Sequence, residues 1–108
     1  MSKTGLIKVL IVEPSKEPYC LEVENELKPM QKIVGGYLES VTLSNRVVVL
    51  CNEDGLSLGL PKNNAFVRGQ WGVVSFVGTY FFVAHEGGEF ASLTDEDVTM
   101  CLSYIYPQ

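Results

Sequence analysis

The sequence predicts an α+β fold, in which one small domain is built from a mainly antiparallel sheet with two helices packed on it. Runs of β-branched residues recur along the chain, short turn-forming segments separate them, and two further segments carry apolar residues at helical spacing. The chain has 108 residues, of which 46% are hydrophobic and 19% are charged. This is enough for one core and no more, so we expect residues 1–108 to form a single domain.

The first predicted element is a strand over residues 5–13. Its side chains are almost continuously apolar and often β-branched, which is typical of a strand buried on both faces. Residues 14–18 begin and end with proline, which stops the strand. Residues 19–24 then alternate apolar and polar side chains, so we expect a second strand that pairs back onto the first in a hairpin.

A helix is predicted next. Asn25 can cap its start, and Pro29 is tolerated only near its first turn. Gly35 and Gly36 close it, because glycine accepts the left-handed conformation that ends helices. A corner without side chains would also let a ligand approach the backbone. The prediction depends on four apolar residues at helical spacing: Leu27, Met30, Ile33 and Val34.

Residues 37–43 and 46–51 predict two strands, and Ser44 and Asn45 between them favour a hairpin. Residues 52–55 form a turn in which we expect Gly55 to need a positive φ angle.

The most hydrophobic element is predicted as one strand over residues 71–84. Neither of its faces is polar, since apolar residues occupy both sets of alternate positions. Either the helices cover one face while a second copy of the protein covers the other, or the strand is central in a curled sheet. We favour the first arrangement and therefore expect a homo-oligomer.

The last predicted element is a helix that begins after Thr94. Thr94 caps it, residues 95–97 place acidic groups in its first turn, and Leu93 can pack onto Val98. An apolar stripe predicts its buried face: Val98, Cys101, Leu102 and Ile105.

Charge and composition exclude several classes of function. The net charge is -5 and the eight Lys and Arg residues are scattered, so duplex nucleic acid is not an expected partner. A small nucleotide is allowed, because one or two basic side chains and backbone N–H groups can hold it. No apolar run reaches the ~20 residues of a membrane span, and the start does not have the pattern of a signal peptide. We expect a cytoplasmic protein with no membrane partner.

The sequence contains few residues that could serve in catalysis or metal binding. The three cysteines are far apart, which argues against a disulfide framework, and we expect all three to pack in the core. His85 is the only histidine, so a zinc site within one chain is not expected. No general base with an orienting partner can be identified. The prediction is therefore a protein that is not an enzyme and has no cofactor.

Two segments favour binding of a polar small molecule. Residues 59–64 combine an ammonium group, two amides and a proline, and Arg68 and Trp71 offer a guanidinium and an indole that can hold a phosphate and stack a nucleobase. The alternatives are a solvated loop, an arginine at a hairpin tip and a partly buried tryptophan. The candidate ligand-binding residues are Gly35, Gly36, Tyr37, Arg46, Asn52, Lys62, Asn63, Asn64, Arg68 and Trp71.

The order of two motifs is distinctive. A helix leads into Val-Gly-Gly-Tyr-Leu-Glu at residues 34–39, and Cys-Asn-Glu-Asp-Gly follows at residues 51–55. This pattern resembles a family of small proteins of unknown function that bacteriophages and bacterial mobile elements carry, and the likeness extends from residue 7 to residue 102. In that family the loop at residues 59–64 usually continues as Asn-Arg. Here Asn64 takes the place of the arginine, so an anion would have to use Lys62 or Arg68.

The resemblance and the residues together lead to three hypotheses. The first is a phage-type counter-defence protein that sequesters a nucleotide-derived immune signal, such as a cyclic nucleotide or an ADP-ribose derivative, without catalysis. The second is an inhibitor that binds a host defence protein through the apolar surface of the long strand and the last helix. The third, a minor metabolic enzyme, is the least favoured because catalytic residues were not identified.

Overall fold

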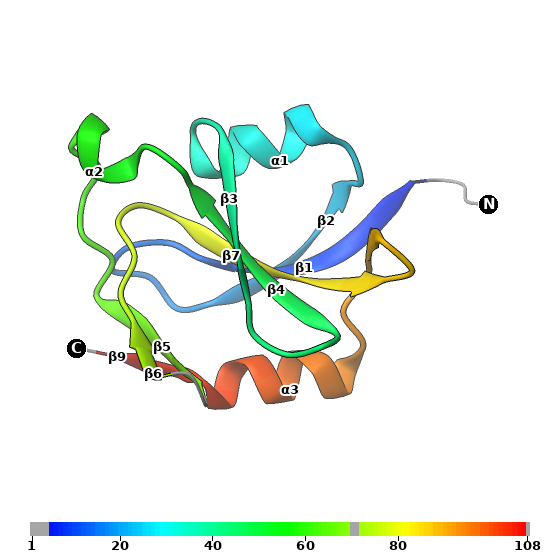
Figure 1. Ribbon diagram of the computed structural model, residues 1–108. Helices are drawn as coiled ribbons and strands as arrows, with labels where there is room; N and C mark the ends of the chain where they lie inside the picture. The colour runs from blue at the N-terminus through cyan, green and yellow to red at the C-terminus, as the bar shows by residue number, and fades with distance from the viewer. Residues whose placement is uncertain (1–4, 70–71, 108) are drawn as a thin grey trace.

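Strand β7 (Tyr80–Glu86) lies at the centre of the molecule, and every side chain from Tyr80 to Ala84 is fully buried. The computed structural model describes residues 5–69 and 72–107 (Figure 1). Around β7 the strands of the main sheet follow the order β2-β1-β7-β4-β3. The bounds of its neighbours are β1 (Leu6–Val12), β2 (Tyr19–Glu24), β3 (Leu38–Thr42) and β4 (Val47–Asn52).

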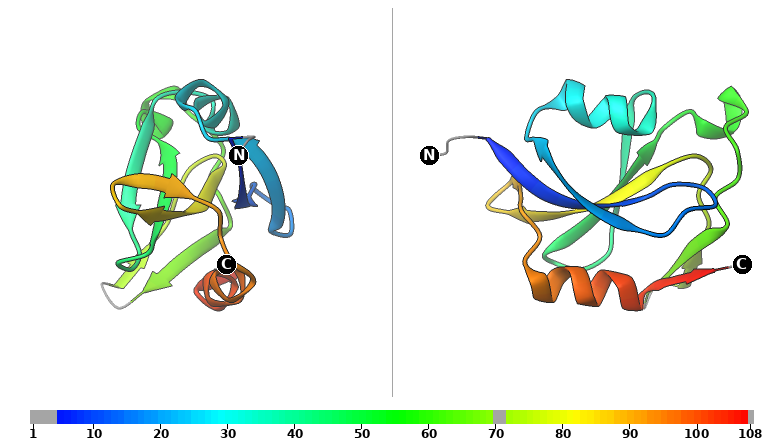
Figure 2. Two further views of the ribbon diagram at one scale, coloured as in Figure 1. Left: turned by 90° about the vertical axis from the view of Figure 1, so that its right-hand side faces the viewer. Right: turned by 180° about the vertical axis from the view of Figure 1, so that it is seen from behind.

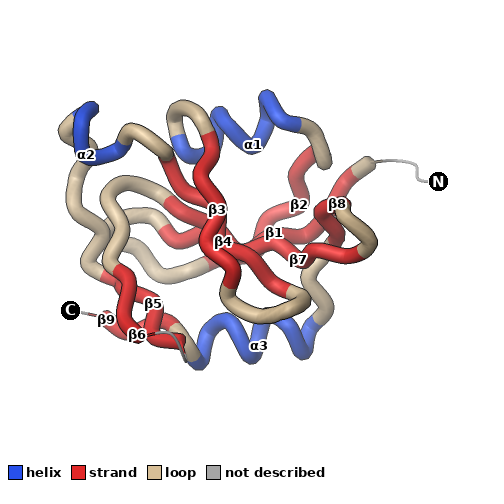
Figure 3. Tube along the Cα trace, viewed as in Figure 1, coloured by secondary structure: helices blue, strands red, loops and turns tan. Residues whose placement is uncertain are grey.

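All pairings within the main sheet are antiparallel. The short strand β8 (Glu89–Ala91) folds back onto the end of β7, beside the start of β1. The predicted hairpins formed by residues 5–24 and 37–51 are both present, with Leu6 opposite Glu24 and Leu38 opposite Asn52. The predicted α+β class with a mainly antiparallel sheet is therefore confirmed, and Figure 3 displays the mixture of helix and strand.

A second, smaller sheet has the order β6-β5-β9. Its strands are β5 (Ala65–Gly69), β6 (Gly72–Val74) and β9 (Ile105–Pro107). The sheet therefore pairs residues 65–67 with residues near the end of the sequence. The prediction of one strand over residues 71–84 is wrong, because β6 belongs to this sheet and β7 to the main one. Between them the chain turns at Gly78, which has a φ of 75° and donates its N–H to the Pro61 carbonyl.

The helices α1 (Leu27–Val34) and α3 (Asp95–Ser103) lie on opposite faces of the main sheet (Figures 1 and 2). Met30 of α1 packs in one apolar cluster with Phe81 of β7, whereas Cys101 of α3 packs in another with Phe82. A single chain thus covers both faces of β7. The reason for expecting a second copy of the protein is removed, and the homo-oligomer stays a prediction.

A third helix, α2 (Gly55–Leu58), was not predicted. Gly55 begins it and does not have a positive φ angle, so that prediction is wrong. The position requires glycine for space instead, since a Cβ atom there would lie 2.6 Å from Cγ2 of Val77. Gly59, with a φ of 70°, ends the helix.

The helix ends were partly predicted. Gly35 closes α1 with a φ of 81° and Thr94 caps α3, both as expected, and Thr94 also forms a capping box with Asp97 that was not predicted. Asn25 is not the cap of α1, since Glu26 holds that position without a side-chain hydrogen bond. The Asn25 amide instead donates to the Phe90 carbonyl.

Two apolar assignments are wrong. Cys20 was expected in the core, but β2 is an edge strand and the thiol is exposed. Leu102 was placed on the buried stripe of the last helix, yet it is 46% exposed. Ile105 packs against the core, although from β9 rather than from the helix.

Asp97 joins α3 to the main sheet. Its carboxylate accepts hydrogen bonds from Arg46 Nε at 3.0 and 3.1 Å and from the Thr94 N–H at 2.8 Å, while Arg46 also pairs with Glu86. Burial on its own would raise the pKa of Asp97, but the hydrogen bonds from Thr94 and Arg46 outweigh it and hold the pKa below its usual value. The ionised carboxylate therefore stabilises the fold.

Asn63 joins the two sheets. It is fully buried, and its amide donates to the carbonyls of Val12 at 3.1 Å and Gly78 at 2.9 Å. Its Oδ1 accepts the N–H of Ala65 at 3.0 Å. One side chain thus connects the end of β1, the turn before β7 and the start of β5.

We expect Asn63→Ala to lower the free energy of unfolding by about 3 kcal/mol, because it leaves buried backbone groups without partners. The matched control is the neighbouring Asn64→Ala. Asn64 is exposed and its Oδ1 accepts one hydrogen bond, from the Ser15 N–H, so the expected loss is below about 1 kcal/mol. Urea unfolding followed by circular dichroism measures both, and equal losses would contradict this role for Asn63.

Acid should weaken the fold through Asp97. A carboxyl with a lowered pKa contributes stability above its unfolded pKa, and this contribution is lost as the pH falls through the folded value. Between about pH 5 and about pH 2 we therefore expect the wild type to lose more unfolding free energy than Asp97→Asn. Glu96→Gln, which changes an exposed carboxyl of the same turn, is the control. Parallel losses in the wild type and Asp97→Asn would contradict the prediction.

Candidate functional site

The two sequence motifs meet in the structure. The pairing of β3 with β4 places Leu38 opposite Asn52 and Glu39 opposite Cys51. The N–H of Glu53 also donates to the carbonyl of Tyr37 at 2.8 Å. The spacing of the motifs therefore has a structural cause, since each forms one side of the same pair of strands.

The Asn52 side chain packs against Gly36, which forms with Gly35 the glycine corner at the end of α1. Its side chain is buried, its amide donates to the Val34 carbonyl at 3.1 Å, and its Oδ1 accepts the Asp54 N–H at 2.8 Å. A Cβ atom on Gly36 would lie 2.7 Å from the amide nitrogen of Asn52. Gly36 thus makes room for an internal capping side chain. The same contacts account for Asn52 without a ligand.

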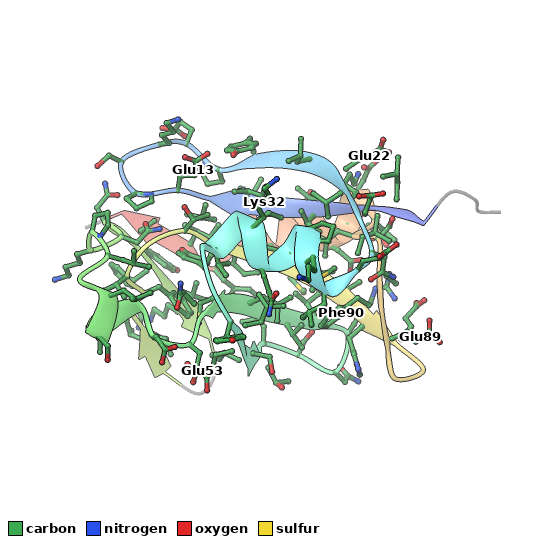
Figure 4. All side chains as sticks on the ribbon, turned by 90° about the horizontal axis from the view of Figure 1, so that it is seen from above. Glu13, Glu22, Lys32, Glu53, Glu89 and Phe90 are labelled. Carbon is green, nitrogen blue, oxygen red and sulfur yellow. The ribbon has the colours of Figure 1, made fainter. Side chains whose placement is uncertain are left out.

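A pocket of about 400 Å³, here called the motif pocket, opens beside this corner between β3, β4 and the chain that leads to β7. Glu39, Glu53 and Asp54 line it, and no lysine or arginine does. Figure 4 labels Glu53 at this end of the molecule. Carboxylates without a cation repel phosphate, so this pocket does not suit an anionic ligand.

Cys51 is the one thiol in the motif pocket. Burial, with a smaller contribution from the Glu39 carboxylate, raises the pKa of Cys51 to about 11. Since the thiolate is the nucleophile, the neutral thiol is unreactive near pH 7. Burial likewise raises the pKa of Cys101 to about 12. Within residues 5–69 and 72–107, no group of His, Cys, Asp and Glu side chains has an arrangement that could hold a metal ion.

The loop at residues 59–64 does not present its polar groups together. Lys62 and Asn64 are exposed, whereas Asn63 between them is buried and bonded to backbone. The Asn64 Oδ1 accepts the N–H of Ser15 at 2.8 Å. Lys62 forms an isolated bridge with Val77. Of the predicted loop residues, Lys62 keeps an exposed charged group for a ligand.

The remaining candidates lie at other places. Gly35 is exposed and ends α1, and Tyr37, two residues later, is 67% exposed. Arg46 directly precedes β4, at the opposite end of the strand from Asn52, and its guanidinium pairs with Asp97 and Glu86. Trp71 lies outside the described residues. The structure therefore distributes the predicted residues over several surfaces and does not gather them in one pocket.

Arg68 belongs to a different surface, which we call the Arg68 face: Phe66, Arg68, Val73 and Tyr106 on the outer side of the small sheet. The inner side of that sheet is formed by residues such as Val67, which is fully buried. Since side chains alternate along a strand, the residues before and after Val67 point outward. Val73 is 57% exposed and Tyr106 is 41% exposed.

The rings and the guanidinium of the Arg68 face are already arranged against one another. The rings of Phe66 and Tyr106 stack with centroids 5.8 Å apart and an interplanar angle of 18°. The guanidinium carbon of Arg68 lies 6.0 Å from the centre of the Tyr106 ring, within cation–π range. Among the residues that the structure describes, no carboxylate lies within 4.0 Å of this guanidinium. The Arg68 guanidinium is thus a positive charge beside the Tyr106 ring, which stacks in turn with Phe66.

The sequence identified Arg68 but not its aromatic neighbours. Phe66 could have been found, because it is two residues from Arg68 and period-two alternation puts both on one face of a strand. Tyr106 could not. It joins the face only because β9 pairs with β5, with Phe66 opposite Tyr106, and residues 105–107 are too few to read as a strand.

Comparison with known proteins identifies a family. A family model described as a domain of unknown function (DUF3846) matches residues 7–105, so the chain belongs to this family. No curated protein and no solved structure shows significant similarity to the chain. Membership in a family of unknown function agrees with the resemblance drawn from the motifs, and carriage by phages and mobile elements stays a prediction. In the described part of the chain, none of the helices has the length and apolar character needed to cross a bilayer.

The state of the thiols can be tested by alkylation. At pH 8 a thiol with a pKa of about 11 is about one part in a thousand thiolate, so we expect native protein treated with iodoacetamide to be modified at Cys20 alone. Cys51 and Cys101 should react only after unfolding in guanidinium. Mass spectrometry of peptides locates the modification. Rapid alkylation of Cys51 in the native state would overturn its assignment as a buried, protonated thiol.

Proposed function

We propose that this member of the DUF3846 family binds a nucleotide-like anion on the Arg68 face and sequesters it without catalysis. The observation that carries the proposal is the arrangement of Arg68 beside the stacked rings of Phe66 and Tyr106 on an exposed face. A nucleobase stacks on aromatic side chains whatever its identity, and a guanidinium pairs with phosphate oxygens through two parallel hydrogen bonds.

The energetic terms favour a small anion over a long nucleic acid. Base stacking on an aromatic side chain contributes about 1–3 kcal/mol per base, and hydrogen bonds to a charged group about 1.5–3 kcal/mol. A ligand with one or two bases and phosphates uses both contributions at one arginine. The net charge of -5 and the acidic motif pocket oppose a strand that carries many phosphates.

Sequestration is favoured over turnover by the groups that surround the face. Phe66, Val73 and Tyr106 supply apolar and aromatic surface, and the thiol of Cys51 lies in another pocket and is held protonated. A protein that holds a signal and releases it unchanged needs only affinity and abundance. The resemblance to phage-carried proteins makes a nucleotide-derived immune signal our first choice of ligand, in the host cytoplasm.

The homo-oligomer that we predicted would serve this function. Arg68, Val73 and Tyr106 of the Arg68 face are exposed to solvent, so a small ligand on them would contact the protein on one side. A second copy placed over the ligand would bury its other side, which strengthens both stacking and charge pairing.

Direct inhibition of a host defence protein is the alternative. It was expected to use the long strand and the last helix, but β7 is buried by its own chain. Apolar side chains are exposed on the last helix, where Leu102 is 46% exposed, and on α2, where Leu56 is 84% and Leu58 is 59% exposed. Such a protein would bind no small molecule, so the same experiment separates the two functions.

We expect the purified protein to deplete one member of a panel of cyclic dinucleotides, cyclic trinucleotides and ADP-ribose derivatives when it is filtered out of solution. Heating the retained protein should release the same compound, as mass spectrometry can verify. Release of a different compound would mean that the protein is an enzyme, and depletion of none would direct the search to a protein partner.

Arg68→Ala should weaken binding of the depleted compound at least about tenfold, because it removes a charged hydrogen-bonding group. Arg68→Lys should fall between Arg68→Ala and the wild type, since a lysine keeps the charge and loses the planar fork. Tyr106→Phe keeps the ring and should bind as the wild type does, whereas Tyr106→Ala and Trp71→Ala should bind more weakly.

The matched control is Lys28→Ala, which removes one exposed cation from α1 on the far side of the molecule. It should leave the affinity unchanged. If Arg68→Ala and Tyr106→Ala both retain wild-type affinity with unchanged circular dichroism spectra, the ligand does not bind on the Arg68 face.

A further inference from the structure

The face of the main sheet that carries α1 is not covered along its whole length. Helix α1 has eight residues, which makes it about 12 Å long, while a seven-residue strand such as β7 extends about 23 Å. Met30 and Val34 of α1 pack over the part of the sheet that contains Leu50 and Phe81. The sheet continues past the start of the helix, and this end of the face stays open.

Three turns enclose the open end. They are the connection from β3 to β4 at Ser44 and Asn45, the turn from β7 to β8 at Gly88 and Glu89, and the start of α1 at Asn25. Together they surround a pocket of about 670 Å³, which we call the end pocket. Figure 4 looks down on this face, with Phe90 beside the start of α1 and Glu89 at the adjacent turn. Its volume is within the range of small-molecule sites.

The end pocket has a partly apolar floor and polar walls. Val48, Phe90 and His85 are half-buried in it, and the rings of His85 and Phe90 meet edge to face with centroids 6.4 Å apart. The exposed hydroxyl groups of Ser40 and Thr42 line one side, because they project from the same face of β3. Such a set of hydroxyl, amide and imidazole groups both donates and accepts hydrogen bonds.

The walls are held by internal hydrogen bonds. The Asn25 amide donates to the Phe90 carbonyl at 3.0 Å, which fixes the start of α1 against β8. The Ser44 hydroxyl oxygen accepts the N–H groups of Arg46 at 3.2 Å and Val47 at 3.1 Å, which fixes the turn between β3 and β4. A pocket whose walls are fixed before binding loses less conformational entropy when a ligand enters.

The charge of the lining selects against anions. No lysine or arginine lines the end pocket, and Glu89 contributes a negative charge. Among the described residues, the side chains of Ser40 and Asn45 form no hydrogen bond. A ligand here meets both donors and acceptors, the half-buried ring of Phe90, and no lysine or arginine of the lining to pair with a phosphate.

From this we infer that the end pocket binds a small uncharged ring that carries several hydroxyl groups, of the monosaccharide class. The hydroxyl groups of such a ring exchange hydrogen bonds with Ser40, Asn45 and the carboxylate of Glu89, and its apolar C–H face lies against Phe90. The end pocket shares no residue with the Arg68 face, and the two ligands differ in charge. The sugar-binding inference and the proposed function can therefore be tested independently of each other.

Titrations followed by ¹H–¹⁵N NMR test the inference on the intact chain. The probes are glucose, galactose, mannose and ribose, each compared with its phosphate ester. At least one neutral sugar should shift the amide signals of residues 40–48 and 85–90 in a saturable way, and its phosphate ester should bind at least about tenfold more weakly, since no cation offsets Glu89.

Two variants locate the site. Ser40→Ala removes one hydroxyl group and Phe90→Leu replaces the ring while keeping apolar bulk, so each should weaken sugar binding severalfold. Ser57→Ala, an exposed hydroxyl on α2, is the matched control and should bind as the wild type does. The inference is overturned if no neutral sugar gives a saturable shift, if a phosphate ester binds as tightly as its sugar, or if the shifts map away from residue 25 and residues 40–48 and 85–90, which line the pocket.

Discussion

Strand β7 has to be covered on both of its faces, and the rest of the molecule follows from that requirement. Tyr80, Phe81, Phe82, Val83 and Ala84 are all fully buried. Burying each large apolar side chain contributes about 1.5–3 kcal/mol, so leaving either face in water would cost much of the stability of a small domain. One chain supplies both covers: α1 for Phe81 and Val83, and α3 with the small sheet for Tyr80 and Phe82.

The way in which α1, α3 and the small sheet pack on the main sheet determines where the possible binding surfaces lie. Helix α1 is shorter than the sheet beneath it, so the end pocket remains next to its start. The small sheet uses its inner face to cover β7, so its outer face, with Arg68 and Tyr106, stays in contact with solvent. The end pocket is thus a part of the main sheet that α1 leaves uncovered, and the Arg68 face is the side of the small sheet that does not pack on the core.

Several polar residues that look like ligand-binding groups serve the backbone instead. A tightly packed small domain has buried turns whose carbonyl and N–H groups need partners, and an asparagine side chain can supply an acceptor and two donors at once. Asn52 does this at the end of α1 and Asn63 does it between the sheets. Asn-rich turns next to glycines therefore have a structural explanation that is independent of any ligand.

By itself, the sequence determined the elements that depend on neighbouring residues. The α+β class, the two hairpins, the closure of α1 by Gly35 and the capping of α3 by Thr94 follow from alternation, helical spacing and the conformational range of glycine. The tertiary structure decided the rest. It divided the apolar run at residues 72–84 between two sheets, it left Cys20 exposed on an edge strand, and it brought Tyr106 beside Arg68. The physical reason is that local patterns specify which face of an element is apolar, while the partner of that face depends on contacts between residues far apart in the chain.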